Sequence, residues 1–346
     1  MSKHSKKGEV KVLGIDLAKQ SFQLHGVDEA GQPVLKKKLS RKQLSAFVAN
    51  LPECLIGLEA CGGAHHWVRV FESYGHTVRM MAPQFVKPYV KSNKNDAVDA
   101  EAICEAVQRP SMRFVPAKGI EQQDIQSLHR IRSQLVARRT AQSNQIRGLL
   151  MEYGVIIPKG ISYVRKQLPL ILEDAENGLS DLFRELLNEL YEEIVHLQER
   201  VEVMEQKLHR LCAQNEDCQR LLTIPGVGLL SATALVAAIG DIGAFKSGRE
   251  LAAWLGLVPR QHSTGGKTTL MGISKRGDSY LRTLLIHGGR TVVRVAHKYE
   301  DRKSRWVSEL DQRRGKNISA VAVANKNART AWALLSKKTT YQAVAV

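Results

Sequence analysis

The chain has 346 residues, is 43% hydrophobic and 25% charged, and carries a formal net charge of +17 at pH 7. These values favour a globular protein of two domains that binds a polyanion such as DNA or RNA; a basic surface that serves only solubility is the alternative. No apolar run is long enough to span a membrane, the basic start lacks the apolar core of a signal peptide, and the five cysteines form no C-x-x-C pair. We therefore expect a cytoplasmic protein without a membrane anchor, a disulfide framework or a zinc site.

Residues 10 to 82 alternate short apolar runs with turn signals. Runs of period two between Gly, Pro and Asp residues predict strands, and longer amphipathic runs predict helices. In chain order we predict strands over 10–16, 21–27 and 33–38, a helix over 41–50, a strand over 55–59, a helix over 64–74 and a strand over 77–82. Three meandering strands followed by alternating helix and strand is the order of a ribonuclease-H-like α/β fold.

Four carboxylates stand where such a fold would carry out phosphoryl transfer. Asp16 and Glu59 each close a predicted strand, and Asp96 and Asp99 follow on a predicted helix. Their spacing of three residues places Asp96 and Asp99 on one helical face. Gathered carboxylates repel one another unless a divalent cation joins them, so we predict a catalytic site for Mg²⁺, with Mn²⁺ as the alternative ion.

A mostly helical stretch is predicted from Asp96 to about residue 153, broken by Pro110 and Pro116. Its second half is basic, which suits a helix that lies along a phosphate backbone. The arginines that carry this prediction are Arg130, Arg132, Arg138, Arg139 and Arg147.

A heptad pattern follows, with apolar residues at alternating steps of four and three. The positions are Phe183, Leu187, Leu190, Ile194, Leu197, Val201, Met204, Leu208 and Leu211. Residues 171–217 also hold thirteen Asp or Glu and four Lys or Arg, a net charge of −9, which leaves +26 on the rest of the chain. The pattern predicts a coiled coil that faces protein, either as a dimerising stalk or as an antiparallel helix pair within one chain.

Beyond Cys218 the chain becomes rich in glycine and small residues, and then strongly basic again. Residues 225–228, Pro-Gly-Val-Gly, precede a predicted helix N-terminus. Exposed backbone amides there would suit an anion, as in helix-hairpin-helix DNA-binding elements; a tight helix connection is the alternative. The C-terminal basic cluster contains Lys298, Arg302, Lys303, Arg305, Arg313, Arg314 and Lys316.

Ser263 stands in a predicted glycine-flanked loop, residues 256–267, together with Arg260, His262 and Lys267. Nearby cations would stabilise a serine alkoxide and the charge that forms at an attacked phosphodiester, and His262 is a candidate to carry the proton. Ordinary turn chemistry is the alternative explanation of a serine in such a loop. A second basic loop follows, which contains Lys275 and Arg276.

Five motifs occur together in one order along nearly the whole chain. They are Gly14-Ile-Asp16-Leu-Ala-Lys, Gly57-Leu-Glu59-Ala, Asn95-Asp96-Ala-Val-Asp99-Ala, Ile224-Pro-Gly-Val-Gly228, and the Ser263 segment followed by Ile273-Ser-Lys-Arg-Gly. In this combination the chain resembles the DEDD-type insertion-sequence transposases, whose relatives include Piv-type DNA invertases and recombinases guided by a bridge RNA.

The resemblance implies a RuvC-like catalytic domain over 8–112, a helical linker and coiled coil over 120–217, and a mainly α-helical serine-containing domain with a helix-hairpin-helix-like element over 218–340. Asp16, Glu59, Asp96 and Asp99 would bind the metal, and Ser263 would become covalently joined to DNA. The implied activity is metal-dependent cleavage and exchange of DNA strands through a phosphoserine intermediate, in the cytoplasm and on the nucleoid of a prokaryotic cell.

The resemblance also implies partners. These are double-stranded DNA, a structured bridge RNA that selects it by base pairing, and further copies of the chain in a dimer or tetramer, where one subunit's carboxylates meet another's serine. Expected nucleic-acid contacts are Arg130, Arg138, Arg139, Arg147, Arg260, Lys267, Lys275 and Arg276. The alternatives are a metal-dependent junction endonuclease that uses water, a site-specific DNA invertase, and a non-enzymatic nucleic-acid-binding scaffold.

Overall fold

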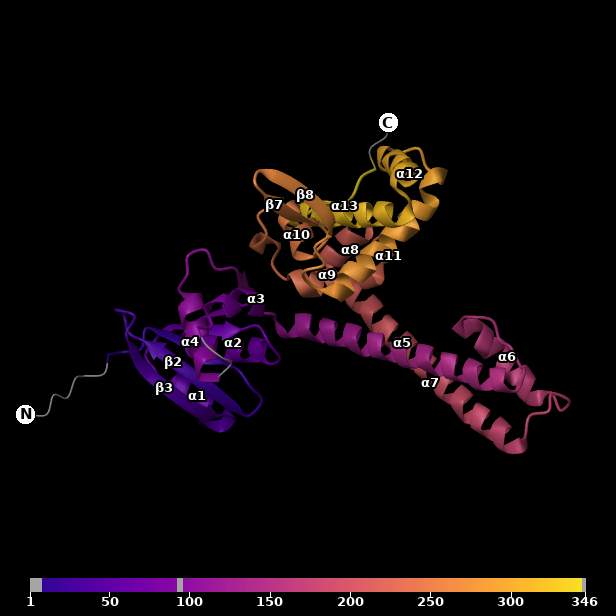
Figure 1. Cartoon of the computed structure of the whole chain (residues 1–346), viewed down its shortest axis with the longest axis horizontal. Coiled ribbons are helices and arrows are strands. Elements are labelled where there is room, and N and C mark those ends of the chain that lie inside the picture. The colour runs from indigo at the N-terminus through magenta and orange to yellow at the C-terminus, as the bar shows by residue number, and fades with distance from the viewer. Residues whose placement is uncertain (1–7, 92–95, 344–346) are drawn as a thin grey trace, which may run out of the picture. The chain divides into compact units, whose positions relative to one another are not determined.

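The computed structural model describes residues 8–91 and 96–343, which divide into two compact units on either side of the step from Gly119 to Ile120. The first unit is a mixed α/β domain built on a central sheet, and the second is mostly helical (Figure 1). Both features confirm the expected fold class at this level. The finer division of the second unit near residue 217 stays a prediction.

The sheet of the first unit has six strands in the order β3-β2-β1-β4-β5-β6. The strands are β1 (Val12–Asp16), β2 (Ser21–Val27), β3 (Pro33–Ser40), β4 (Leu55–Glu59), β5 (Thr77–Met81) and β6 (Phe114–Val115). Strands β1, β2 and β3 form an antiparallel meander, β4 and β5 run parallel to β1, and β6 is antiparallel to β5. The hairpin between β2 and β3 closes at Gly31, whose φ of +75° suits glycine.

Helices cover the sheet and complete its core. They are α1 (Arg41–Ala49), α2 (Ala64–Ser73), α3 (Pro83–Val86), the short 3₁₀ helix η1 (Lys87–Tyr89) and α4 (Asp96–Val107). Helix α2 packs its apolar face on the sheet through Trp67 and Phe71, which are buried. Helix α4 buries Ile103 and Val107.

Helix α4 approaches the sheet unusually closely because two strand residues are glycines. A Cβ atom on Gly14 of β1 would lie 2.3 Å from the backbone oxygen of Ala100, and one on Gly57 of β4 would lie 2.9 Å from the Cβ of Val107. Both distances are too short for real atoms, so only glycine allows α4 to lie directly on these strands. The helix that carries two of the four carboxylates is thereby held against the strand that carries a third.

The predicted elements of the first unit are confirmed, with ends that differ by one or two residues from the observed ones. The prediction omitted α3, η1 and β6, which are only two to four residues long and too short to show a period. Helical structure stops at Val107 and resumes at Ile120, so the break around Pro110 and Pro116 is real and contains β6. The motif residue Asn95 lies outside the described residues.

The second unit begins with long helices and continues with shorter ones around a small strand pair. Its elements are α5 (Ile120–Glu152), α6 (Ile161–Glu173), α7 (Asp181–Gln214), α8 (Glu216–Leu222), α9 (Leu229–Ile239), η2 (Ile242–Ala244), α10 (Gly248–Trp254), β7 (Pro259–Thr264), β8 (Lys267–Ile273), α11 (Ser279–Val295), η3 (Ala296–Lys298), α12 (Arg302–Arg314) and α13 (Lys316–Lys337). Helices α8, α9, α10, α11 and α13 share one hydrophobic core.

Helices α5 and α7 pack against each other as an antiparallel pair (Figure 1). Arg132 Nε and Nη2 donate to Glu205 Oε1 at 2.8 and 2.5 Å, and ten residues further along α5 Gln142 donates to Glu193 at 2.7 Å. A later position on α5 thus pairs with an earlier position on α7, so the two helices run antiparallel. This arrangement is the intrachain alternative predicted from the heptad pattern.

The pair buries one half of the heptad seam more completely than the other. Phe183, Leu187, Ile194, Val201 and Leu208 are buried, at most 7% exposed. The alternate positions Leu190, Leu197 and Met204 are only half-buried, and Leu211 is exposed. A role of the seam in dimerisation therefore stays a prediction.

The Pro-Gly-Val-Gly segment is the connection between α8 and α9. A Cβ on Gly288 of α11 would lie 1.8 Å from the backbone oxygen of Gly226, so the turn and α11 touch backbone to backbone. The carbonyl oxygen of Pro225 accepts a hydrogen bond from Asn327 Nδ2 at 2.9 Å. The structure shows a tight helix connection here, and the binding of an anion by its backbone amides stays a prediction.

All five cysteines are free. Four of them are buried. Burial raises the pKa of Cys54 to about 11 and the pKa values of Cys104 and Cys218 to about 12. Cys61, by contrast, is exposed. Within the described ranges no helix is both long enough and apolar enough to cross a membrane.

The close approach of α4 to β1 yields a stability prediction. Gly14→Ala should lower the free energy of unfolding of the first unit by about 1–3 kcal/mol, because the new methyl group collides with the backbone of α4. Chemical denaturation followed by circular dichroism measures the change. Gly148→Ala is the control, because Gly148 is an exposed position of α5 where a Cβ meets nothing within 4 Å. This substitution should stabilise the helix by up to about 1 kcal/mol. Equal stabilities of the Gly14 variant and the wild type would contradict the packing account.

Candidate active site

Three of the four predicted carboxylates meet at one place. Asp16, Asp96 and Asp99 each offer an oxygen atom, and these atoms all lie within 4.8 Å of one another. Asp16 is the last residue of β1, and the two others belong to the first turn of α4. The glycine contact between α4 and β1 brings the helix start to the strand end, so the cluster follows directly from the packing of the sheet.

Glu59, the fourth predicted carboxylate, stands at the neighbouring strand end but outside this closest group. Strands β1 and β4 are parallel with Ile15 opposite Leu58, so Asp16 and Glu59 end adjacent strands at the same edge. Burial, and then the negative charge of Asp99, raise the pKa of Glu59. Glu59 thus lies within electrostatic reach of the cluster, and its ionised form costs the fold stability as the pH rises through the shifted pKa.

Cys61 lies near the carboxylates, within reach of the negative charges of Glu59 and Asp16. Partial loss of water around its sulfur raises the pKa of Cys61, and the charges of Glu59 and Asp16 raise it further. Sequence analysis noted Cys61 only as one of five cysteines without a C-x-x-C pair, and only its distance of two residues from Glu59 could have indicated its position beside the site. It is a neighbour of the cluster that the sequence analysis missed.

The donor set fits a hard divalent cation. All the donors are carboxylate oxygens, the ligand type that Mg²⁺ and Mn²⁺ prefer, and oxygens within 4.8 Å of one another can reach a single ion. In the part of the chain that the structure describes, no salt bridge joins Glu59, Asp96 or Asp99 to a Lys or Arg.

Ser263 lies in a strand, so the prediction of a loop at this position is corrected. It belongs to β7, which pairs with β8, and it stands opposite Thr268. The two strands are joined by Gly265 and Gly266, whose φ angles of +56° and +78° are those of a tight hairpin turn. The glycines that suggested a loop form only its tip, and Ser263 is exposed close to that tip.

The hydroxyl of Ser263 is held by two neighbours on the same face of the hairpin. Gln261 Nε2 donates a hydrogen bond to Ser263 Oγ at 2.8 Å, and Ser263 Oγ donates to Thr268 Oγ1 at 3.4 Å. Side chains alternate along a strand, so His262 leaves the opposite face and is not brought to the serine. Gln261 is a contact that sequence reasoning missed, although its spacing of two residues from Ser263 would have indicated it once a strand was assumed.

The predicted nucleic-acid contacts around the hairpin are accessible. Arg260 and Lys267 lie on the two strands, and Lys275 and Arg276 follow β8 in the segment that leads to α11. All four side chains are exposed. This surface has the charge that a phosphate backbone requires.

The arginines of α5 fall into two groups. Arg130 and Arg138 are exposed. Arg139 donates to the side chain of a glutamine on α7, and Arg147 donates to a backbone carbonyl at 3.0 Å, so both are engaged within the helical pair. Only the first group is exposed, and a nucleic-acid role for any of these arginines stays a prediction.

Lys303, a member of the C-terminal basic cluster, has a structural role instead. Its side chain is buried, and Nζ donates to Asn327 Oδ1 at 2.8 Å. Burial lowers the pKa of Lys303 to about 8. The amine therefore ties α12 to α13 and is not presented to a partner.

Two family models match the chain. One, described as "Transposase IS116/IS110/IS902 family", matches residues 218–304, and the other, the DEDD_Tnp_IS110 model, described as "Transposase", matches residues 13–155. The first match contains the Ser263 hairpin, and the second contains all four carboxylates. The two sets of candidate residues thus fall in the two matched segments.

Similar proteins carry corresponding names. The chain is 52% identical over 331 residues to a "Probable family 20 transposase" of Pseudomonas aeruginosa, covering 95% of this chain and 98% of the relative. It is 49% identical to the "Transposase for insertion sequence element IS1111A" of Coxiella burnetii, covering 96% and 92%. A "Pilin gene-inverting protein" of Moraxella bovis is 39% identical over 74 residues, 20% of this chain and 22% of that protein. The chain belongs to the IS116/IS110/IS902 family of transposases, enzymes that cleave DNA and transfer its strands.

Proposed function

We propose that this transposase cleaves DNA with a RuvC-like metal site and joins the cut strand to Ser263. The observation that carries the proposal is the cluster of Asp16, Asp96 and Asp99, whose oxygens lie within 4.8 Å of one another. An antiparallel meander β1–β2–β3 followed by β4 and β5 parallel to β1 is the arrangement expected of a ribonuclease-H-like domain, which supports the RuvC-like assignment.

Asp16, Asp96 and Asp99 would hold the ion, with Glu59 beside them at the end of the neighbouring strand. A bound Mg²⁺ or Mn²⁺ supplies Lewis acidity and charge for a phosphodiester. The carboxylates fix its place at the sheet edge, because α4 is locked on β1 by the contact at Gly14.

Ser263 would provide the attacking oxygen. A bond forms between Oγ and phosphorus while the bond from phosphorus to the 3′ oxygen of the DNA breaks, and the hydroxyl proton ends on that oxygen. A 3′ hydroxyl of a second strand then attacks the same phosphorus, and the serine regains a proton. The exposed position near the hairpin tip and the hydrogen bond from Gln261, which orients Oγ, support this role.

The family resemblance further leads us to propose a structured bridge RNA and a homo-oligomer of two or four subunits. Exposed Arg260, Lys267, Lys275 and Arg276 supply charge for RNA or DNA phosphates. The similarity of a short segment to a pilin gene-inverting protein keeps DNA inversion as a second candidate function. Inversion and transposition would use the same chemistry on differently arranged DNA.

The metal site can be tested without DNA. Mg²⁺ or Mn²⁺ at about one hundred times its Kd should stabilise the first unit by about 2.7 kcal/mol, and Asp99→Asn should remove most of this effect. Thermal melting in EDTA and in titrated metal measures it. Glu105→Gln, on the same helix but outside the cluster, is the matched control and should keep the metal response. An unchanged response in Asp99→Asn would refute the assignment.

The nucleophile can be tested by trapping covalent protein–DNA adducts. The reaction would contain element-end DNA, Mg²⁺ and, in one arm, RNA transcribed from the noncoding DNA beside the gene. We expect adducts that denaturing gels resolve and mass spectrometry maps to Ser263, and a loss of at least about a hundredfold in Ser263→Ala, since the attacking oxygen is gone. Thr264→Ala, the adjacent hydroxyl, is the control.

Two results would contradict this scheme. Adducts that persist in Ser263→Ala would exclude this serine, and normal cleavage without any adduct would identify an endonuclease that uses water. Adducts that form equally well without RNA would contradict RNA guidance only.

The oligomer proposal concerns apolar side chains that α7 leaves uncovered. Leu182 and Leu186 are 66% and 46% exposed and lie one turn apart. Replacing both with Glu should shift the molar mass in light scattering to that of a smaller species, because the charges would have to be buried in the interface. Gln206→Glu, exposed on the same helix, adds charge without removing apolar surface and should leave the mass unchanged. A double variant with wild-type mass would exclude this contact.

A further inference from the structure

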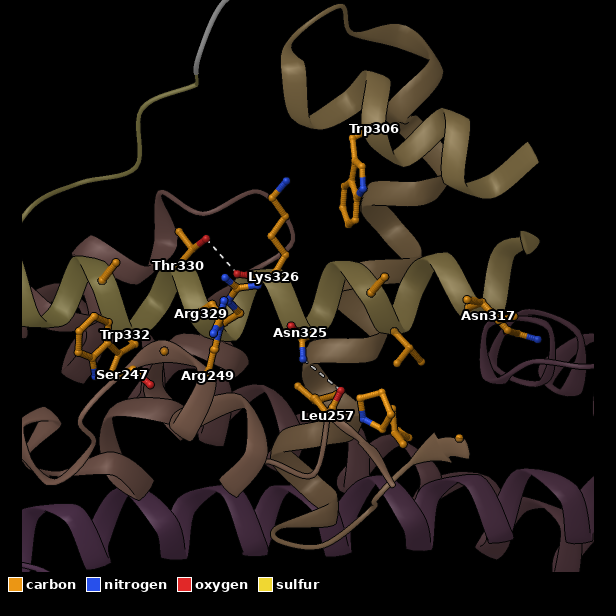
Figure 2. Close-up of a pocket in the computed structure, with 18 of the residues that line it drawn as sticks. Ser247, Arg249, Leu257, Trp306, Asn317, Asn325, Lys326, Arg329, Thr330 and Trp332 are labelled. Atoms are coloured by element: carbon orange, nitrogen blue, oxygen red, sulfur yellow. Dashed lines mark hydrogen bonds between the residues drawn. The ribbon is translucent and has the colours of Figure 1, made fainter. Parts of the chain in front are cut away.

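The second unit contains a groove of about 1400 Å³ that none of the candidate residues explains. Helix α13 forms its length, and α10, the bases of β7 and β8, and α12 complete the wall. Figure 2 shows Lys326 extending from α13 on the side where Trp306 lies. Arg249 of α10 and Arg329 of α13 line the same groove. The groove exceeds the volume of about 300–1,000 Å³ that is usual for a small-molecule site.

The lining carries positive charge that no salt bridge among the described residues balances. Arg249, Lys326 and Arg329 contribute three cations, and no Asp or Glu is among the lining residues. Throughout residues 8–91 and 96–343, no salt bridge joins any of the three to a carboxylate. Burial, and then the charges of Arg302 and Arg329, lower the pKa of Lys326, as expected where like charges are gathered. A groove with this lining is suited to bind an anion.

The same groove is lined by aromatic and apolar side chains. Lys326 makes a cation–π contact with Trp306, with Nζ 4.2 Å from the centroid of the ring. Trp332 is fixed by a hydrogen bond from Nε1 to the backbone oxygen of Phe245 at 2.8 Å. The apolar side chains Met271 and Ile318 are 42% and 55% exposed in the same lining. A ligand that fits must bring both negative charge and faces that stack.

An unpaired strand of nucleic acid meets both requirements. A duplex presents phosphates but keeps its base faces stacked inside, and an apolar peptide would leave three cations unbalanced. We propose that this groove binds an unpaired segment of nucleic acid, with bases stacked on Trp306 and phosphates paired with Arg249, Lys326 and Arg329. Because Pro259, Met271 and Ile273 of the β7–β8 pair form part of the wall, the bound strand would pass beside the hairpin that carries Ser263.

The inference rests on the chain being a transposase and does not require the proposed roles of Ser263 or of the carboxylates. Its test is fluorescence anisotropy of the full-length protein in EDTA, where no cleavage takes place. The probes are labelled oligothymidine and oligouridine of about twelve nucleotides, and a duplex of equal length. A failure of the metal site or of the nucleophile therefore leaves this result unaffected.

We expect Trp306→Ala to weaken single-strand binding by about tenfold, and Trp306→Phe, which keeps an aromatic face, to restore most of it. Arg329→Glu should weaken single-strand binding to a similar extent. Arg314→Glu makes the same change of charge on exposed α12 outside the groove and should have a much smaller effect. Duplex binding should change little in both Trp306 variants, and circular dichroism melting checks that each variant is folded.

Preference for oligothymidine would identify DNA as the source of the strand, and preference for oligouridine would identify RNA; either supports the groove. Wild-type affinity for both oligonucleotides in Trp306→Ala and in Arg329→Glu would overturn the proposal. So would a loss of oligomer mass in these variants without loss of oligonucleotide binding, because the groove would then be a protein interface.

Discussion

The contact between α4 and β1 is the constraint on which the candidate metal site depends. Gly14 has no side chain, so the backbone of α4 lies where a Cβ would otherwise stand, 2.3 Å from the oxygen of Ala100. Gly57 allows the same helix to approach β4. These contacts set the distance between the strand end at Asp16 and the first helical turn, and with it the separation of the carboxylates. The precision of the site thus comes from backbone packing in the core rather than from contacts among the acids.

The two units carry opposite local charge. The first unit has a cluster of carboxylates, and the second has a groove lined by cations. In the first unit burial, and then the charges of nearby carboxylates, raise the pKa of Glu59 and of the neighbouring Cys61. In the second unit burial, and then the charges of Arg302 and Arg329, lower the pKa of Lys326. In the proposed scheme, a metal ion would balance the carboxylates of the first unit and nucleic-acid phosphates would balance the cations of the second.

The apolar heptad pattern of α7 packs within the chain and also leaves apolar side chains exposed. The seam that suggested a stalk is used first within the chain, where α5 covers Phe183, Leu187 and the buried positions that follow. Ion pairs such as Arg132 with Glu205 fix the antiparallel register. Arginines on α5 are consequently divided between packing and solvent, which local sequence does not reveal. Apolar residues that remain exposed on α7 are what a second subunit could cover.

The sequence by itself determined the longer strands and helices of the first unit, the four acids as candidate residues, and the family, because period, turn residues and motif spacing are local properties of the chain. It missed α3, η1 and β6, which are too short to show a period. It placed Ser263 in a loop, since the glycines of a hairpin tip and those of a loop look alike until strand pairing with Thr268 is known. Tertiary structure alone decided which three acids lie closest, which arginines are engaged, and that Lys303 is buried. It also created the groove, whose lining residues span positions 247 to 333. These features depend on contacts between residues far apart in the chain, and such contacts leave no periodic signal in the sequence.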